Sequence, residues 1–288
     1  MTVSANAKVN FTLEVFGKRA DGYHALRSVV MPISLSDTLD IETTDDGLIT
    51  SDAGYDDDLC VKAARILKSS VSSLPSSVGA TIRVTKRIPA GGGLGGGSAD
   101  AAAVLRTLDE LWKTGLSLEE LAEVGAQVGS DVPALVLGGP VIMEGRGERV
   151  KDLGLKTEDL NLVLVNPGIH SSTAAVYAAC ETRPLNSQNA TAKMVEALES
   201  GDLERIAVAL MNDLQPSAVK LHPEIADALV SLKTAGVIGA MMSGSGSSVF
   251  GLVRTADEAV RISSELNARG YQSWPVRTWL SRLGSNQD

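Results

Sequence analysis

The first sixteen residues alternate between apolar and polar positions. Apolar side chains recur at every second residue, which is typical of a half-buried β-strand. They are Val3, Ala5, Ala7, Val9, Phe11, Leu13 and Val15. Lys8 and Asn10 fall between them, and successive side chains of a strand point to opposite faces. The pattern alone therefore favours a solvent-exposed lysine at position 8.

Similar patterns predict the other elements of the N-terminal half. Alternation indicates strands, and apolar residues at a spacing of three to four indicate helices. Ser117 and Glu120 have the spacing of a capping box, which begins a helix that ends near Val128. The predicted strands cover 28–33, 37–43 and 80–88, the predicted helices cover 59–70, 99–113 and 117–128, and a hairpin covers 141–149.

The pattern changes around residues 156–159, where a second set of elements begins. Its predicted strands cover 160–165, 237–242, 248–253 and 272–280, and its predicted helices cover 171–180, 190–199, 202–212, 223–235 and 256–269. Strands and helices of this kind in two successive layers predict an α+β fold. We place the boundary near residue 156, which gives domains at 1–156 and 157–288.

A glycine-rich stretch joins the strand at 80–88 to the helix at 99–113. Between Pro89 and Ser98 it contains six glycines, three on either side of Leu94. Glycine loses the most backbone freedom on folding, so ordering this stretch carries a large entropic cost. A flexible linker is one alternative, but linkers join polar segments rather than two periodic elements. Bare amides beside the positive end of a helix instead indicate an anion site, with phosphate the obvious candidate.

Two common phosphate motifs do not describe this stretch. The Walker pattern requires a lysine before the hydroxyl residue, whereas Gly97 precedes Ser98. Gly91, Gly93 and Gly96 satisfy the pattern GxGxxG, but in so glycine-rich a run the match is nearly automatic. A dinucleotide-binding fold would also place that pattern after its first strand. We therefore keep the anion-binding loop and reject both motif labels.

Two further loops have compositions that fit ligand binding. Residues 243–248 read Ser-Gly-Ser-Gly-Ser-Ser between two predicted strands, although hairpin turns are commonly rich in these residues. With the first glycine stretch, this loop could close on the two ends of a phosphoryl group. Residues 17–24 hold Lys18 and Arg19 next to Tyr23 and His24. That loop is either a simple turn or a place where a base stacks or a phosphate binds.

Asp131 has two interpretations. It precedes Pro133 and an apolar run, which is the pattern of a helix N-cap. A carboxylate at a helix start is also ionised and fixed in direction, which suits a base that accepts a hydroxyl proton. From the residues alone both interpretations stay open.

Composition narrows the classes of function. A formal net charge of −9 argues against a nucleic-acid or anionic-membrane surface. Two cysteines far apart suggest core thiols, and three scattered histidines do not suggest a zinc site. No apolar run has the length or flanks of a signal peptide or a membrane span. We expect a cytoplasmic protein that acts on a small anionic molecule.

Three stretches in this order resemble the GHMP small-molecule kinase superfamily: residues 7–10 (Ala-Lys-Val-Asn), 89–98 and 243–247. Residues 8–10 followed by 17–24 are similar to the kinases of this superfamily that act on 4-diphosphocytidyl-2-C-methyl-D-erythritol, and residues 129–133 and 166–168 strengthen the match. The resemblance implies a ribosomal-protein-S5-domain-2-like N-terminal domain and a ferredoxin-like C-terminal domain. It also implies transfer of the ATP γ-phosphoryl group to the 2-hydroxyl of that substrate, in the non-mevalonate (MEP) route to isoprenoid precursors.

The resemblance further implies roles for residues at matching positions. Asp131 would take the hydroxyl proton, and Lys8 would stabilise both the carboxylate and the developing charge. This fits phosphoryl transfer, which depends mainly on positioning and charge stabilisation. A cytosine would lie between two tyrosine rings, with a histidine reading its edge, and two polar side chains would contact the methylerythritol diphosphate. These substrate-binding residues are Tyr23, Tyr177, His24, Asn10 and Thr173.

For ATP, the resemblance implies one lysine near the adenine and two loops around the phosphates. These residues are Lys86, then Pro89, Gly91, Gly92, Gly93, Leu94, Gly95, Gly96, Gly97 and Ser98, and finally Ser243, Gly244 and Ser245. Magnesium is expected with ATP, with phosphates and water as most of its ligands, and no protein ligand is assigned. Relatives often have an asparagine where this chain has Asp58. An aspartate cannot donate as the amide does, so Asp58 is left out of the adenine contacts.

Two other functions compete with this one. Another GHMP kinase, of the homoserine or mevalonate type, would share the glycine loops, but the basic and aromatic loop at 17–24 argues against it. A non-catalytic metabolite sensor on the same fold is the alternative from a different class. The presence of both Lys8 and Asp131 disfavours a sensor, because binding alone has no chemical need for the pair.

Overall fold

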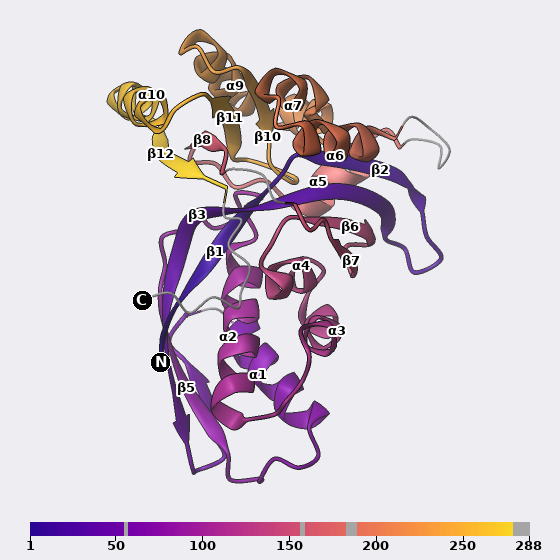
Figure 1. Cartoon of the computed structure of the whole chain (residues 1–288), viewed down its shortest axis with the longest axis vertical. Helices are drawn as coiled ribbons and strands as arrows, with labels where there is room; N and C mark the ends of the chain where they lie inside the picture. The colour runs from indigo at the N-terminus through magenta and orange to yellow at the C-terminus, as the bar shows by residue number, and fades with distance from the viewer. Residues whose placement is uncertain (55–56, 156–158, 183–188, 279–288) are drawn as a thin grey trace.

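The computed structural model describes residues 1–54, 57–155, 159–182 and 189–278 of the 288-residue chain. The large N-terminal sheet and its helices form the lower part of Figure 1, and the helices of the C-terminal half cover the top. The α+β expectation is confirmed by two sheets that are each packed against helices. The predicted domain boundary near residue 156 lies outside the described residues and stays a prediction.

The larger sheet is built around one long strand, β3, which pairs antiparallel with β1, β2, β5 and β6. Strand β9 pairs with β2, β4 with β5, and β7 with β6. The strands are β1 (Thr2–Asn10), β2 (Thr12–Lys18), β3 (His24–Thr44), β4 (Ile49–Ser51), β5 (Gly79–Thr85), β6 (Val141–Gly145), β7 (Arg149–Asp152) and β9 (Met211–Asn212). The helices that accompany this sheet are α1 (Leu59–Ser70), α2 (Gly96–Trp112), α3 (Leu118–Val128) and α4 (Val132–Leu137).

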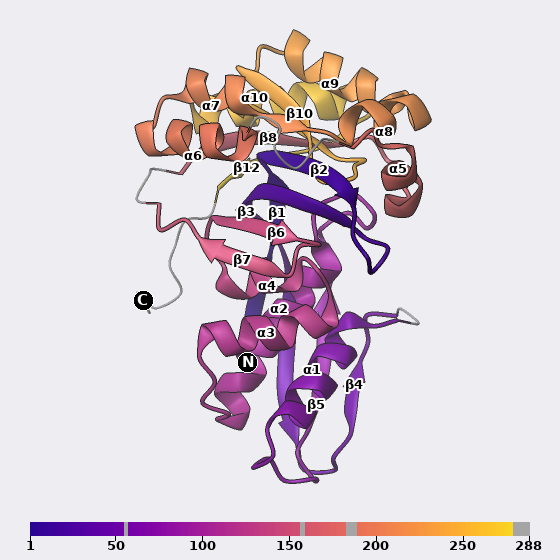
Figure 2. The same ribbon diagram turned by 90° about the vertical axis from the view of Figure 1, so that its right-hand side faces the viewer.

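The second sheet has the order β10-β11-β8-β12 and is antiparallel throughout. Its strands are β8 (Asn161–Asn166), β10 (Gly239–Met242), β11 (Val249–Val253) and β12 (Gln272–Arg277). The helices of this half are α5 (Thr173–Ala179), α6 (Ala190–Ser200), α7 (Leu203–Ala209), α8 (Gln215–Leu221), α9 (Glu224–Thr234) and α10 (Ala256–Ala268). Figure 2 shows α6–α9 along the top, with β2, β3, β6 and β7 between them and α1–α4.

The long strand β3 differs from the prediction of two strands at 28–33 and 37–43. Its alternation continues without a break, and Leu35, Asp37 and Leu39 all lie on the buried face. The predicted gap at residues 34–36 is part of the strand. Conversely, the predicted continuous strand at 3–16 is broken at Phe11, where the register against β3 shifts by one residue. Such a shift is the signature of a β-bulge.

Two smaller corrections concern the C-terminal half. The helix predicted at 202–212 ends at Ala209, and Met211–Asn212 instead form β9, parallel to β2. Helix α8 was not predicted at all. The capping box of Ser117 and Glu120 and the hairpin of β6 and β7 are confirmed.

The two halves are joined by buried contacts. The ring of Phe11 in the first half stacks on Phe250 in the second, with centroids 5.5 Å apart. Glu14 of β2 is fully buried and accepts hydrogen bonds from the backbone N–H groups of Ala190 and Thr191 at the start of α6. These contacts bring the loops of both halves together around the site. None of the helices in the described part of the chain has the length and apolarity needed to cross a bilayer.

Candidate active site

A cavity of about 1180 Å³ lies between the two halves. It is lined by β1, the loop between β2 and β3, the start of α4, helix α5 and two loops. These are the glycine loop (residues 89–95) and the serine–glycine loop (residues 243–248). Of the ligand-binding and catalytic residues predicted from the sequence, all except Ser243 line this cavity. Sites for a single small molecule are roughly 300–1,000 Å³, so the cavity has room for two substrates.

The glycine loop leads directly into α2. Gly91, Gly93 and Gly95 have φ values of +66°, +74° and +70°, a conformation that glycine adopts readily and other residues rarely do. Helix α2 begins at Gly96, and no side chain caps it. Its first N–H groups and positive end are therefore available to an anion in the cavity.

The two loops touch each other. The hydroxyl of Ser243 donates to the carbonyl of Gly93 (3.0 Å), and the N–H of Ser248 donates to the carbonyl of Gly92 (3.1 Å). A Cβ atom at position 93 would overlap the backbone oxygen of Ser243. Glycine is therefore needed at position 93 both for its conformation and for this close approach.

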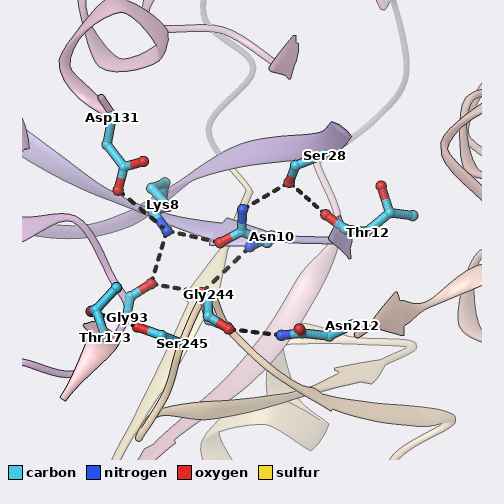
Figure 3. A network of polar contacts seen from close by, with 11 residues as sticks. Lys8, Asn10, Thr12, Ser28, Gly93, Asp131, Thr173, Asn212, Gly244 and Ser245 are labelled. Carbon is cyan, nitrogen blue, oxygen red and sulfur yellow. Dashed lines mark hydrogen bonds and ion pairs between the residues drawn. The ribbon is translucent and has the colours of Figure 1, made fainter. Parts of the chain in front are cut away.

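Lys8 lies at the centre of the site, between both loops and Asp131 (Figure 3). Its ammonium group donates to Asn10 Oδ1 (2.8 Å) and to the carbonyl of Gly93 (3.0 Å). It also lies 3.7 Å from Asp131 Oδ2. Lys8 is only 4% exposed, so the solvent-exposed lysine favoured by the strand pattern is wrong. The strand face that carries Lys8 is covered by the glycine loop, and the N–H of Lys8 donates to the carbonyl of Leu94 (3.0 Å).

Asp131 directly precedes α4, but its side chain makes no capping hydrogen bond. One third of the side chain is exposed, and it lines the cavity and faces Lys8. The structure therefore favours the second interpretation of this residue, a carboxylate directed at a ligand. The helix start has Val132 and Pro133 at its first positions, and proline has no N–H to satisfy there.

A chain of side-chain hydrogen bonds fixes the direction of Asn10 (Figure 3). Its amide nitrogen donates to Ser28 Oγ (2.8 Å), and Ser28 in turn donates to the carbonyl of Thr12 (2.5 Å). The amide oxygen is therefore directed at Lys8. Asn212, which the sequence reading missed, donates to the carbonyl of Gly244 (2.9 Å) and so holds the serine–glycine loop. It lies on β9, a strand of two residues with no periodic pattern to reveal it.

The aromatic residues lie at another part of the cavity. The rings of His24 and Tyr177 are stacked with centroids 5.6 Å apart and planes 28° apart. Tyr23 is 55% exposed. The guanidinium group of Arg146 lies over its ring, with the guanidinium carbon 5.4 Å from the ring centroid. Burial lowers the pKa of His24, and the charge of Lys18 adds to this; both effects favour the neutral imidazole. Burial raises the pKa of Tyr177, and the charge of Asp131 adds to this.

Arg146 was noted in the sequence only as part of a hairpin turn. It lies at the turn between β6 and β7, lines the cavity and approaches Tyr23 from 123 positions further along the chain. Lys18 also lines the cavity and pairs with His24 between β2 and β3. This acidic protein therefore places two cationic side chains beside the aromatic residues.

The remaining predicted residues also have defined partners. Thr173 at the start of α5 shares a hydrogen bond with Ser245 (2.8 Å). Lys86 donates to two carboxylates, Asp37 and Asp100, and its contact with an adenine stays a prediction. Asp58 caps α1 by accepting from the N–H of Cys60 (2.8 Å).

Magnesium is implied by the resemblance. Among the described residues, no group of three or more His, Cys, Asp or Glu side chains could hold a metal ion. The cavity nevertheless has hard oxygen donors at Ser98 and Asp131. This set fits a Mg²⁺ ion that is held mainly by phosphates and water, and it does not form a protein cage.

Comparisons with known proteins agree with this geometry. The models of the GHMP kinases N-terminal domain and C-terminal domain match residues 58–139 and 194–272. The chain is 41% identical over 290 residues to the 4-diphosphocytidyl-2-C-methyl-D-erythritol kinase of Pelotomaculum thermopropionicum, covering 98% of this chain and 99% of that protein. It is 37% identical to the protein of the same name from Symbiobacterium thermophilum, covering 96% and 99%.

Solved structures show the same similarity. A 4-(cytidine 5'-diphospho)-2C-methyl-D-erythritol kinase superposes with a TM-score of 0.82 at 34% identity, covering 98% of this chain and all of the other. A homoserine kinase from Cytophaga hutchinsonii superposes with a TM-score of 0.74 at 19% identity, covering 97% and 96%. At that identity the second match shows the fold alone.

Proposed function

Because the chain belongs to the 4-diphosphocytidyl-2-C-methyl-D-erythritol kinases, a family of the GHMP kinases, we propose how its residues carry out that reaction. The enzyme transfers the γ-phosphoryl group of ATP to the 2-hydroxyl of its substrate, in the MEP route to isoprenoid precursors. The two-domain GHMP fold predicted from the sequence is confirmed by this membership. Homoserine and mevalonate kinases share the fold at 22% identity or less.

The observation that carries the proposal is the pairing of Lys8 with Asp131 beside the glycine loop. In our proposal, the N–H groups of the glycine loop and the start of α2 bind the triphosphate of ATP. The hydroxyls of Ser98 and Ser245 lie along the same cavity and add donors. The glycine loop thus holds ATP, the phosphoryl donor. The phosphoryl acceptor enters from the side of the aromatic residues.

The chemical step follows from this arrangement. The 2-hydroxyl oxygen attacks the γ-phosphorus, the bond to the bridging oxygen of ADP breaks, and Asp131 accepts the hydroxyl proton. Lys8 lies beside Asp131 and stabilises the charge on the transferred group. Magnesium bound to the phosphates would neutralise part of their charge. Because the reacting groups need little more than alignment, the rigid contacts of Lys8 supply much of the catalysis.

The acceptor is recognised at the aromatic residues. We propose that its cytosine stacks on Tyr23 and Tyr177, and that neutral His24 forms hydrogen bonds with the edge of the base. Asn10 and Thr173 contact the methylerythritol diphosphate. The diphosphate also requires positive charge, and Arg146 and Lys18 are the cations that line this part of the cavity. A cytoplasmic location accords with the use of ATP.

A panel of acceptors tests the proposed function. Purified protein with MgATP should form ADP with 4-diphosphocytidyl-2-C-methyl-D-erythritol and show at least a hundredfold lower kcat/KM with homoserine or mevalonate. Preferred turnover of either alternative would assign the chain to another kinase of the fold. ATP binding without turnover of any acceptor would favour a metabolite sensor.

Tyr23→Ala should raise the KM for the cytidyl substrate. Stacking of a base on an aromatic ring is worth roughly 1–3 kcal/mol, which corresponds to about a tenfold rise in KM. The KM for ATP should not change, because in this proposal Tyr23 stacks on the base of the acceptor and does not contact ATP. Tyr23→Phe keeps the ring and is the matched control, with KM near that of the wild type. An unchanged acceptor KM in Tyr23→Ala would remove Tyr23 from the substrate site.

A further inference from the structure

Three charged side chains form a cluster at the base of the glycine loop. Asp37 comes from the buried face of β3, Lys86 follows β5, and Asp100 lies in the first turns of α2. The ammonium group of Lys86 lies 2.5 Å from Asp37 Oδ2 and 2.6 Å from Asp100 Oδ2. The side chains of Asp37 and Asp100 are 0% and 4% exposed. Two buried carboxylates thus share one cation.

Asp37 fixes the segment that enters the glycine loop. Its Oδ1 atom accepts hydrogen bonds from the N–H groups of Arg87 (2.5 Å) and Ile88 (2.8 Å). Asp100 belongs to the helix in which the loop ends. At the same place a Cβ atom on Gly96 would lie 3.0 Å from the side chain of Ile88. The cluster therefore joins the beginning of the loop to its end.

This joint matters because the loop has few side chains of its own to hold it. A glycine-rich backbone has many accessible conformations, and its N–H groups bind an anion well only when they are already in place. Fixing both ends restricts the residues between them. Burying two carboxylates is energetically unfavourable. In return, their contacts keep the phosphate-binding loop rigid.

The environment of Asp100 is unfavourable for a charged carboxylate and lowers the stability of the fold. Its Oδ1 atom is buried without a hydrogen-bond partner. Burial raises the pKa of Asp100 to about 6, the negative charge of Asp37 adds to this, and Lys86 opposes it. The thiol of Cys60 on α1 also lies close to this carboxyl, and Asp58 lies close to the thiol. At neutral pH the ionised carboxylate of Asp100 thus lowers the stability of the folded state.

We infer that Asp37 and Asp100 are positioning residues, which clamp the two ends of the glycine loop through Lys86 and so set the affinity for ATP. The inference rests on the proposed use of ATP. Neither aspartate contacts the reacting atoms in this scheme, and neither affects the acceptor.

Titration calorimetry with MgATP tests the clamp without any acceptor. Asp100→Ala should raise the Kd for MgATP roughly tenfold, since a misplacement of about 1 Å can cost far more than that. Asp100→Asn keeps an oxygen acceptor for Lys86 and should show a smaller rise. Asp109→Ala is the matched control, because Asp109 lies on the same helix and accepts from the hydroxyl of Thr114 and the N–H of Leu116, away from the loop. It should leave the Kd unchanged.

Steady-state kinetics add a second comparison. Asp100→Ala should raise the KM for ATP and leave the KM for the acceptor unchanged. If its Kd and KM for ATP equal those of the wild type or of Asp109→Ala, the clamp is overturned. Should Asp100→Ala fail to fold, Asp37→Asn tests the same joint, and a wild-type Kd in that variant overturns it equally. Failure of the proposed function looks different, since the wild type would then bind MgATP without phosphorylating the acceptor.

The pH dependence of stability gives a readout specific to the Asp100 charge. A carboxyl whose pKa is raised from 3.8 to about 6 in the folded state destabilises the fold when it is ionised. Asp100→Asn should therefore have a higher Tm than the wild type at pH 7.5. The difference in Tm should shrink as the pH falls from about 6 to about 4. A Tm difference that does not change with pH would contradict a buried, ionised Asp100.

Discussion

Replacing Asp131 by asparagine should lower kcat by roughly a thousandfold, which is within the range expected for loss of a general base. The amide has nearly the same shape as the carboxylate, so Lys8 keeps a neighbouring oxygen and the cavity keeps its form. The amide cannot accept the proton of the 2-hydroxyl. Steady-state kinetics with saturating ATP and acceptor measure the effect.

The Tm of this variant should stay close to the wild-type value, because the side chain of Asp131 caps no helix. Asp152→Asn is a suitable control, since Asp152 ends β7 and does not line the cavity. It should keep wild-type kcat. An Asp131→Asn enzyme with kcat within tenfold of the wild type would show that Asp131 is not the base.

Lys8→Met should reduce kcat by about a hundredfold or more, as is found when a charge-stabilising donor is removed from an active site. Methionine keeps most of the buried stem but removes the ammonium group that contacts Asn10 and Gly93. The loss leaves those two oxygens without this donor and Asp131 without its cation. We therefore expect a higher KM for ATP as well, together with a lower Tm.

Lys8→Arg separates charge from geometry. It restores a cation, but the guanidinium group does not fit the compact contacts of a buried ammonium, so activity should remain far below that of the wild type. Recovery of full activity in Lys8→Arg would mean that only the charge at this position matters. Wild-type kcat in Lys8→Met would exclude Lys8 from catalysis.

The elements with a clear period were predictable from the sequence. The strand, glycine loop and α2 appear in the structure in the predicted order, and the helix of the capping box ends at Val128 as expected. Two failures have a common cause. Residues 34–36, left out of the predicted strands, continue β3, where Ser36 pairs with Asn6 of β1, and Met211–Asn212 form β9 beside β2. In both cases a partner distant in the sequence decided the outcome.

The burial of Lys8 has the same explanation. A strand pattern assigns the two faces but does not say which of them another segment covers, and the covering segment here is the glycine loop, 85 residues away. The site residues implied by the resemblance, apart from Ser243, line one cavity, and their roles stay predictions. The resemblance did not indicate Arg146 or Asn212, or the stacking of His24 on Tyr177. The stacking of His24 on Tyr177 joins the two halves, and the other two contacts join segments of one half that are far apart in the sequence.

The reaction product shows which hydroxyl of the acceptor receives the phosphoryl group. Wild-type enzyme, MgATP and 4-diphosphocytidyl-2-C-methyl-D-erythritol should be incubated to completion, and the product examined by ³¹P and ¹³C NMR. We predict one new phosphomonoester, coupled to the carbon that bears the 2-hydroxyl, in equal amount to the ADP formed. Asp131→Asn should give almost none in the same time. ADP formation without a phosphorylated acceptor, or a phosphate on a different hydroxyl, would contradict the account.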